Sequence, residues 1–257
     1  MPIHQALFSN DEIAELNSAS IVLARECMRD FGVSLPEPPE RTQIGPVNRM
    51  ERRYGLADEK MAREHGYHLG SRDPRTAKKE KWGLSRDQRL ILTGTSSSNG
   101  KQAPKVTEFN GREIPSGGCW KVGERRLTPK GMTFGESSKI RELDRKGFME
   151  SEKDPQVQAA FSTWASCMTS KGYSYPNPYA PAADSKFQGN IENKAEIKVA
   201  VADVNCKKRV NLVGVWYGVE RSKQQSLIKM NSAEVQAAKK QKESQLADAR
   251  RVIKQKD

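Results

Sequence analysis

Residues 195–220 read AEIKVAVADVNCKKRVNLVGVWYGVE, within a stretch, 192–229, that contains no proline. Wound at 3.6 residues per turn, its apolar residues fall on two stripes that together cover most of the helix surface. A narrow polar edge that includes Asp203 and Lys207 is left for solvent. The pattern predicts one long, largely buried helix around which the rest of the chain packs. The two stripes are Val199, Ala202, Cys206, Val210, Val213 and Tyr217, and Ile197, Val201, Val204, Leu212, Val215 and Val219.

Two glycines interrupt the polar edge of this predicted helix. Gly214 and Gly218 lie four residues apart on one face. Each costs about 1 kcal/mol of helix propensity relative to alanine. We therefore expect a neighbouring element to pack closely against them.

The rest of the sequence predicts shorter helices between proline- and glycine-rich connections. Ser9 or Asn10 caps the first helix, which ends at Gly32. The pair Asn110-Gly111 between short β-prone runs predicts a hairpin. The serine- and glycine-rich stretch 93–104 predicts an exposed, mobile loop. Further helices are expected at about 58–64, 85–92, 116–127, 137–150, 154–171 and 233–253.

Composition limits the class of protein. Hydrophobic residues make up 35% of the chain, and the mean hydropathy is −0.79, so the core is modest. No run of apolar residues is long enough for a membrane-spanning helix. The first residues lack the basic and apolar run of a signal peptide. Two interpretations stay open: a cytosolic protein, or the mature segment of an exported protein behind an added Met.

The positive charge is concentrated in the middle of the chain. Residues 41–130 hold 20 of the 44 Lys and Arg residues against 10 of the 32 Asp and Glu, and the net charge of the chain is +12. The electrostatic field of such a positively charged segment attracts polyanions, including nucleic acid, anionic lipid headgroups and anionic cell-wall polymers. The alternative is a solubilising surface that binds none of them.

One internal repeat divides the sequence into two related halves. The segment from Cys27 to Pro38 and the segment from Cys167 to Pro178 share cysteine, methionine, glycine, serine and two prolines at identical offsets. Each copy predicts the last turns of a helix, a glycine in the left-handed conformation and an extended exit.

Each half holds one further cysteine, Cys119 in the first and Cys206 in the second. Four cysteines allow three pairings, and the duplication favours Cys27 with Cys119 and Cys167 with Cys206. Each bridge is then worth about 3–5 kcal/mol. Persistent disulfides imply an oxidising compartment. Four buried, reduced thiols in a cytosolic protein are the alternative.

These motifs carry a resemblance to a known group. The repeated CMxxxG followed by prolines, GGC at 117–119, HGYH at 65–68, and VADVxCK with VWxxVE in 201–220 resemble uncharacterised, exported actinobacterial proteins that are often lipid-anchored. The resemblance covers most of the chain. It implies a location outside the membrane and a mature segment without its signal, and it brings no catalytic residues.

Catalytic and cofactor motifs are missing from the sequence. It contains no GxSxG, no GxGxxG, no P-loop, no CxxC and no CxxCH. His65 and His68 are three residues apart, but Gly66 lies between them, and a packed or exposed pair is favoured over a metal site. We therefore expect neither an enzyme nor a cofactor. A secreted enzyme with a site assembled from distant residues is kept as an alternative.

Binding is the favoured function class. The first hypothesis is an extracytoplasmic accessory protein of the cell envelope that presents a basic surface to an envelope protein or an anionic polymer. The second is an intracellular nucleic-acid-binding protein that uses the same residues against phosphates. The candidate contact residues are Arg72, Arg75, Lys78, Lys79, Lys81, Trp82, Arg86 and Arg89. The alternative for this segment is an ordinary solvated loop.

Together these features predict a mainly α-helical fold of two related halves around one long C-terminal helix, with a minor β-hairpin and two disulfides. The predicted divisions are 1–135, a helical half with the basic segment and the hairpin; 136–231, a second helical half; and 232–257, a helical tail. The tail carries a thin apolar stripe, so self-association through it is a third hypothesis.

Overall fold

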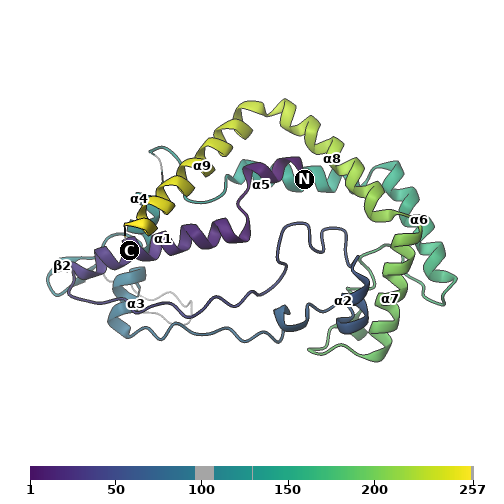
Figure 1. Cartoon of the computed structure of the whole chain (residues 1–257), viewed down its shortest axis with the longest axis horizontal. Helices are drawn as coiled ribbons and strands as arrows, with labels where there is room; N and C mark the ends of the chain where they lie inside the picture. The colour runs from purple at the N-terminus through teal and green to yellow at the C-terminus, as the bar shows by residue number, and fades with distance from the viewer. Residues whose placement is uncertain (96–106, 129, 256–257) are drawn as a thin grey trace. The chain divides into compact units, whose positions relative to one another are not determined.

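The fold is mainly helical (Figure 1). The structure, a computed structural model, describes residues 1–95, 107–128 and 130–255. The predicted loop at 93–104 lies mostly outside these residues. The helices are α1 (Asn10–Arg29), α2 (Glu59–His65), α3 (Arg86–Thr93), α4 (Gly118–Arg126), α5 (Ser138–Glu152), α6 (Pro155–Thr169), α7 (Lys194–Arg209), α8 (Leu212–Met230) and α9 (Ser232–Lys254). Short 3-10 helices occupy Pro2–Ala6, Gly70–Arg72 and Ser185–Phe187. The fold class is confirmed.

The predicted hairpin is also confirmed. Strands β1 (Glu108–Phe109) and β2 (Arg112–Glu113) pair antiparallel, with Phe109 opposite Arg112. The turn residues Asn110 and Gly111 have φ values of 49° and 74°. Positive φ at both central residues is what a two-residue type I′ turn requires, and Asn-Gly supplies it at low cost.

The stretch 192–229 forms two helices rather than the single long helix predicted. α7 ends at Arg209, and α8 begins at Leu212. Between them Asn211 has a φ of 49°, in the left-handed region. Asparagine tolerates this conformation better than most residues. The periodicity missed the break because apolar residues continue on both sides of it.

The predicted polar edge is wrong for two of its residues. Asp203 is 0% exposed and Lys207 is 2% exposed, because their side chains pair with each other inside the protein, with Lys207 Nζ 2.9 Å from Asp203 Oδ2. The described residues also bring no other element close to the two glycines, contrary to the prediction. A Cβ at Gly218 would meet nothing within 4 Å, and the atoms nearest to Gly214 belong to Asn211.

The chain divides into two compact units, each made of separate segments. The first unit contains residues 1–3, 41–79 and 142–232, and the second contains 4–40, 80–141 and 233–257. These boundaries differ from the predicted divisions at 135 and 231. Residues 41–79 belong to the same unit as α6, α7 and α8. Each unit is closed by one disulfide, Cys167–Cys206 in the first and Cys27–Cys119 in the second.

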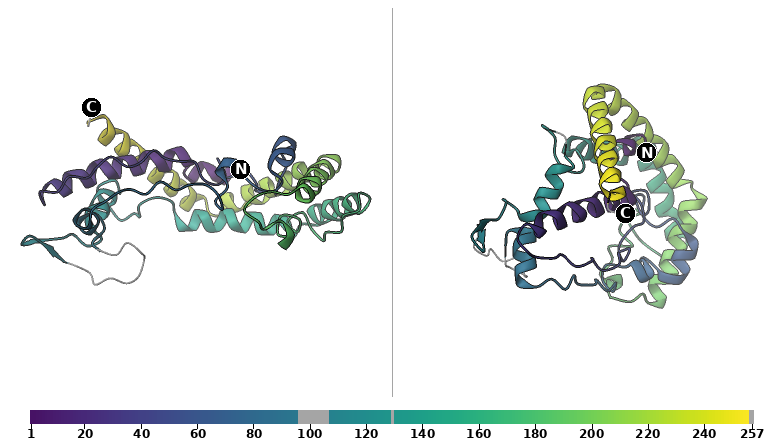
Figure 2. Two further views of the ribbon diagram at one scale, coloured as in Figure 1. Left: turned by 90° about the horizontal axis from the view of Figure 1, so that it is seen from below. Right: turned by 60° about the vertical axis from the view of Figure 1, so that its left-hand side comes forward.

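In the first unit, α7 packs against α2 and α6, and α6 packs against α8. The views from other directions keep α2 beside α7 (Figure 2). Trp164 and Trp216 are fully buried at the centre of this core. The ring of Phe161 lies 5.0 Å from that of Trp216, edge to face. The other buried members are Tyr54, Val157, Ala160, Cys167, Met168, Phe187, Val199, Ala202, Cys206 and Leu212.

In the second unit, α1 packs against α4, and α3 packs against both. Ser9 caps α1: its hydroxyl accepts from Glu12 N, and Glu12 accepts from Ser9 N. This is a capping box, which the sequence predicted only as a cap. Leu23 from α1 and Leu127 after α4 are among the buried residues of one cluster, and Met28 and Cys119 are in another.

The two copies of the repeat have the same backbone structure. Gly32 and Gly172 have φ values of 70° and 85°. Val33 N donates to Met28 O at 3.2 Å, and Tyr173 N donates to Met168 O at 3.0 Å. This hydrogen bond and the one from each glycine N–H form a Schellman motif. The predicted glycine terminators are confirmed in both halves.

The α1–α4 contact depends on a glycine. A Cβ at Gly123 would lie 2.6 Å from Ser20 O, a backbone atom that cannot rotate away. We expect Gly123→Ala to lower the free energy of unfolding by about 1–3 kcal/mol, as overpacking does. Urea unfolding measures this effect. Gly83→Ala is the matched control, since a Cβ there meets nothing within 4 Å. Equal midpoints for the two variants would contradict the close α1–α4 contact.

Candidate functional site

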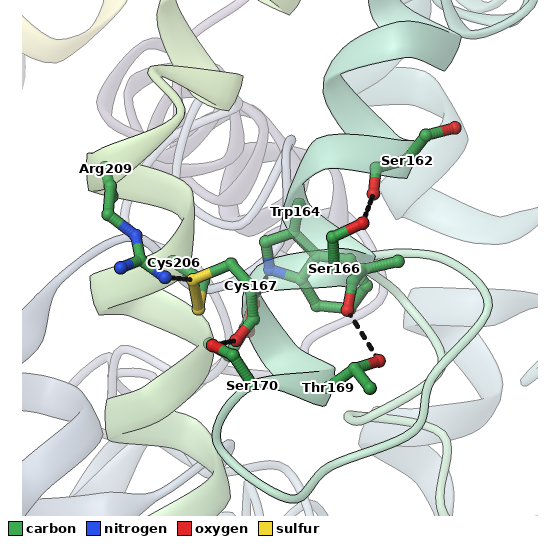
Figure 3. The surroundings of a disulfide bond; sticks show 10 residues. Ser162, Trp164, Ser166, Cys167, Thr169, Ser170, Cys206 and Arg209 are labelled. Carbon is green, nitrogen blue, oxygen red and sulfur yellow. Dashed lines mark hydrogen bonds between the residues drawn. A yellow bond between two sulfur atoms is a disulfide. The ribbon is translucent and has the colours of Figure 1, made fainter.

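Both predicted disulfides are present, and they join α6 to α7 and α1 to α4. The Cα atoms are 5.7 Å apart in Cys167–Cys206 and 5.6 Å apart in Cys27–Cys119. Around the first bridge, Arg209 reaches the sulfur of Cys167, and Trp164 lies beside it on α6 (Figure 3). All four cysteines of the chain are therefore oxidised.

The two arginines at the start of the predicted basic segment are paired with carboxylates. Arg72 donates to both oxygens of Glu51, at 2.9 and 2.7 Å. Arg75 donates to both oxygens of Asp73, at 2.8 Å each. Such fork-shaped pairs fix the side chains and neutralise much of their charge. Arg72 and Arg75 therefore contribute less to a polyanion surface than the sequence suggests.

The remaining members of the segment divide between the two units. Lys78 and Lys79 are exposed and belong to the first unit, as do Arg72, which is partly buried, and Arg75. In the second unit, Lys81 and Arg86 are exposed, Arg89 donates to Leu84 O, and Trp82 packs against the apolar cluster of Met28 and Cys119. The structure thus places the eight predicted residues in two groups of four. Trp82 is partly buried and contributes to packing.

The sequence did not predict a cavity of about 460 Å³ in the first unit. Its walls come from three separate segments, 46–56, 67–75 and 178–182. All three are connections outside the long helices, which fix them in place. The volume is in the range of small-molecule sites. The lining residues are Pro46, Arg52, Gly55, Leu56, Tyr67, Leu69, Asp73, Pro74, Arg75, Pro178, Tyr179 and Ala182.

A buried polar network supports one wall of this cavity. Asp203 accepts from Trp164 Nε1 at 2.9 Å and from the hydroxyl of Tyr67 at 3.3 Å, besides its pair with Lys207. Lys207 Nζ also donates to Leu56 O at 3.0 Å. Burial raises the pKa of Asp203 and lowers that of Lys207, because desolvation disfavours both charges. The network fixes Tyr67 and Leu56, two residues of the cavity wall.

The two histidines of the HGYH segment lie in different surroundings. His68 is 2% exposed and lies between two carboxylates, with Nδ1 3.4 Å from Asp73 and Nε2 3.5 Å from Glu196. His65 is partly exposed, near Glu64 and Glu192. In the described residues, no group of three or more His, Cys, Asp or Glu side chains is arranged to hold a metal ion.

Comparisons with protein-family models, curated proteins and solved structures found no match to this chain. The interpretation of the site therefore rests on its own residues. Among residues 1–95, 107–128 and 130–255, every helix is too short or too polar to cross a lipid bilayer.

Two carboxylates near the cavity make the stability of the first unit depend on pH. The side chain of Arg75, with backbone N–H donors, holds the pKa of Asp73 far below its usual value, and Arg72 lowers that of Glu51. Because the folded protein holds these protons more weakly than the unfolded chain, acid favours unfolding. The two carboxylates contribute fully to the free energy of unfolding above their pKa values in the unfolded chain. This contribution is lost as the pH falls through their lower pKa values in the folded protein.

We expect the wild type to lose more stability between about pH 6 and about pH 3 than the variant Asp73→Asn, which lacks one of these carboxylates. Urea unfolding at each pH gives, for each protein, the slope of the free energy of unfolding against pH. Parallel slopes would mean that Asp73 does not have a lowered pKa in the folded protein.

Proposed function

We propose that this chain is a non-catalytic, extracytoplasmic binding protein of the cell envelope. The observation that carries the proposal is the pair of disulfides, one in each unit, with no cysteine left as a thiol. Disulfides of this kind persist in oxidising compartments and are rare in the cytosol. The resemblance to exported, often lipid-anchored actinobacterial proteins favours the same location.

The proposed ligand of the basic surface is an envelope protein or an anionic wall polymer. The charge of +12 supports this ligand class. The exposed Lys78, Lys79, Lys81 and Arg86 are the strongest contact candidates, since none of them has a carboxylate partner among the described residues. Nucleic acid is the competing polyanion.

Location is tested on the native protein in intact cells. We expect added protease to degrade it without lysis, and alkylation followed by intact-mass measurement to find both bridges. Native protein with four free thiols, protected from protease until the cells are lysed, would contradict the proposal.

Ligand class is tested with a purified anionic wall polymer and double-stranded DNA over a range of salt concentrations. We expect the triple variant of Lys78, Lys79 and Lys81 to glutamine to release the polymer at lower salt than the wild type. A triple variant of the exposed Lys153, Lys171 and Lys198, all in the first unit, removes the same charge outside the basic segment and serves as control. Equal effects of the two triples would remove the basic segment from the proposal. Tighter binding of DNA with a steep salt dependence would favour the nucleic-acid function.

A further inference from the structure

Arg52 is an unusual residue in the wall of the first unit's cavity. Its φ is 66°, in the left-handed region, where residues other than glycine are rare. Its neighbour Arg53 is fixed to Glu220, whereas Arg52 lines the cavity. Costly backbone conformations of this kind persist where the surrounding structure enforces them, and they cluster at binding sites.

Arg52 carries the unneutralised charge of the cavity. Among the described residues its guanidinium makes one hydrogen bond, from Nη2 to His68 O at 2.9 Å, and no carboxylate lies within ion-pair distance of it. The two other charged residues of the lining, Asp73 and Arg75, neutralise each other. The lining therefore has a net charge of +1.

Burial makes this charge costly. Desolvation lowers the pKa of Arg52 more than the attraction of Glu51 raises it. A guanidinium has five N–H donors in a planar fork that fits a carboxylate or a similar oxyanion. Within the part of the chain that the structure describes, only one of these five donors in Arg52 has a protein partner, so an anion in the cavity would gain both a hydrogen-bonding partner and a compensating charge.

The rest of the lining is apolar or aromatic. Pro46, Leu56, Leu69, Pro74, Pro178 and Ala182 contribute aliphatic surface. The ring of Tyr67 is stacked on Phe187, and that of Tyr179 packs edge to face against Trp216. Both rings are thus held by the core. Sites with apolar walls and a few placed polar groups are typical of small organic ligands.

We propose that this cavity binds a small organic anion, with its anionic head on Arg52 and its apolar body between the walls formed by 46–56, 67–75 and 178–182. This site goes beyond the proposed polymer surface, because it uses none of Lys78, Lys79 and Lys81.

A pair of fluorescent probes tests the proposal on the full chain. 1-Anilinonaphthalene-8-sulfonate has an aromatic body and one anionic group, and N-phenyl-1-naphthylamine has nearly the same body without the charge. We expect the anionic probe to bind with one site per chain and more tightly than the neutral one. Equal affinities, or several weak sites for the anionic probe, would overturn the proposal.

The variant Arg52→Gly separates recognition from folding. Glycine adopts a φ of 66° without strain, so the variant is expected to unfold at the wild-type temperature or higher. Loss of a charge-assisted contact should weaken the anionic probe about 10- to 100-fold, with little change for the neutral probe. Arg63→Gln removes an exposed charge on α2 and should change neither. An unchanged affinity of Arg52→Gly for the anionic probe would overturn the proposal.

A second variant tests the cavity without relying on Arg52. Ala182 lines the cavity but is itself exposed, so Ala182→Trp should fold normally and obstruct the space. We expect it to weaken both probes. If the anionic probe binds Ala182→Trp as tightly as the wild type, its site lies elsewhere, and the proposed location is wrong. Neither Arg52→Gly nor Ala182→Trp should change retention on the wall polymer, so the two proposals can fail separately.

Discussion

Removing the Cys167–Cys206 bridge by replacing both residues with alanine is expected to lower the free energy of unfolding by about 4 kcal/mol, from the entropy of the loop it closes. That loop spans 39 residues. The Cys27–Cys119 loop spans 92 residues, and the same relation gives about 5 kcal/mol for its double alanine variant. Alanine is used because serine would place a hydroxyl at three buried positions and, at Cys27, a partly buried one.

The larger loss is expected in the unit that each bridge closes. Trp164 and Trp216 belong to the first unit, whereas Trp82 and Trp120 belong to the second. Hydrogen exchange read by mass spectrometry measures the protection of peptides from each unit separately. The Cys167/Cys206 variant should lose protection mainly in α6 and α7, and the Cys27/Cys119 variant mainly in α1 and α4. Equal losses in both units from either variant would contradict the assignment of one bridge to each unit.

Local signals made much of this fold predictable from the sequence. A cap such as Asp154 before Pro155, a terminating glycine such as Gly172, and the pair Asn110-Gly111 each act within a few residues. The structure has the predicted element at each of them. The bridges were predictable for a different reason, because the duplicated frame favoured one of the three possible pairings.

What the sequence did not show depends on contacts between distant segments. Asp203 and Lys207 have the spacing of a solvated helix edge, and only Trp164 and Tyr67, brought from other elements, show why they are buried. The cavity has the same origin, since one of its walls, 178–182, lies more than 100 residues after the other two in sequence. Arg52 was missed because nothing within a few residues predicts its left-handed backbone.

The charges that the sequence assigned to binding show the limit of composition. Arg72 and Arg75 count toward a basic surface in any sum of residues, but each has a carboxylate partner nearby. A net charge describes the field at a distance. It does not say which cations remain available to a ligand. In the cavity formed by 46–56, 67–75 and 178–182, Arg52 is the cation that has no carboxylate partner among the described residues.

The pair of Arg53 and Glu220 gives the largest expected effect of a single substitution. Glu220 is 0% exposed, and it accepts from Arg53 Nε at 3.0 Å, from the hydroxyl of Tyr54 at 2.8 Å and from Gln224 Nε2 at 2.8 Å. Arg53 also pairs with Asp144, at 2.9 Å. Burial desolvates the guanidinium, but the two carboxylates outweigh this and raise the pKa of Arg53 above its usual value.

Replacing Arg53 with methionine keeps most of the apolar stem and removes the charge. Glu220 is then left buried without its cation, and we expect the free energy of unfolding to fall by about 3–5 kcal/mol. Urea unfolding followed by tryptophan fluorescence reports the change, because Trp216 lies in the core beside Tyr54. Arg63→Met, which breaks the exposed pair with Glu59, should change the free energy of unfolding far less, because water screens an exposed ion pair.

The double variant Arg53→Met with Glu220→Gln distinguishes two causes of the destabilisation: the loss of the ion pair itself, and the burial of a carboxylate without a cation. If the loss of stability comes from an uncompensated carboxylate, neutralising Glu220 should recover a large part of it. A buried ion pair can be replaced by neutral groups at little cost, whereas removing one partner leaves the other as a costly buried charge. A double variant less stable than Arg53→Met would show instead that the remaining hydrogen bonds of Glu220 to Tyr54 and Gln224 stabilise the fold even without the cation. In that case Glu220, rather than Arg53, would be the residue that holds residues 53–54 against α8.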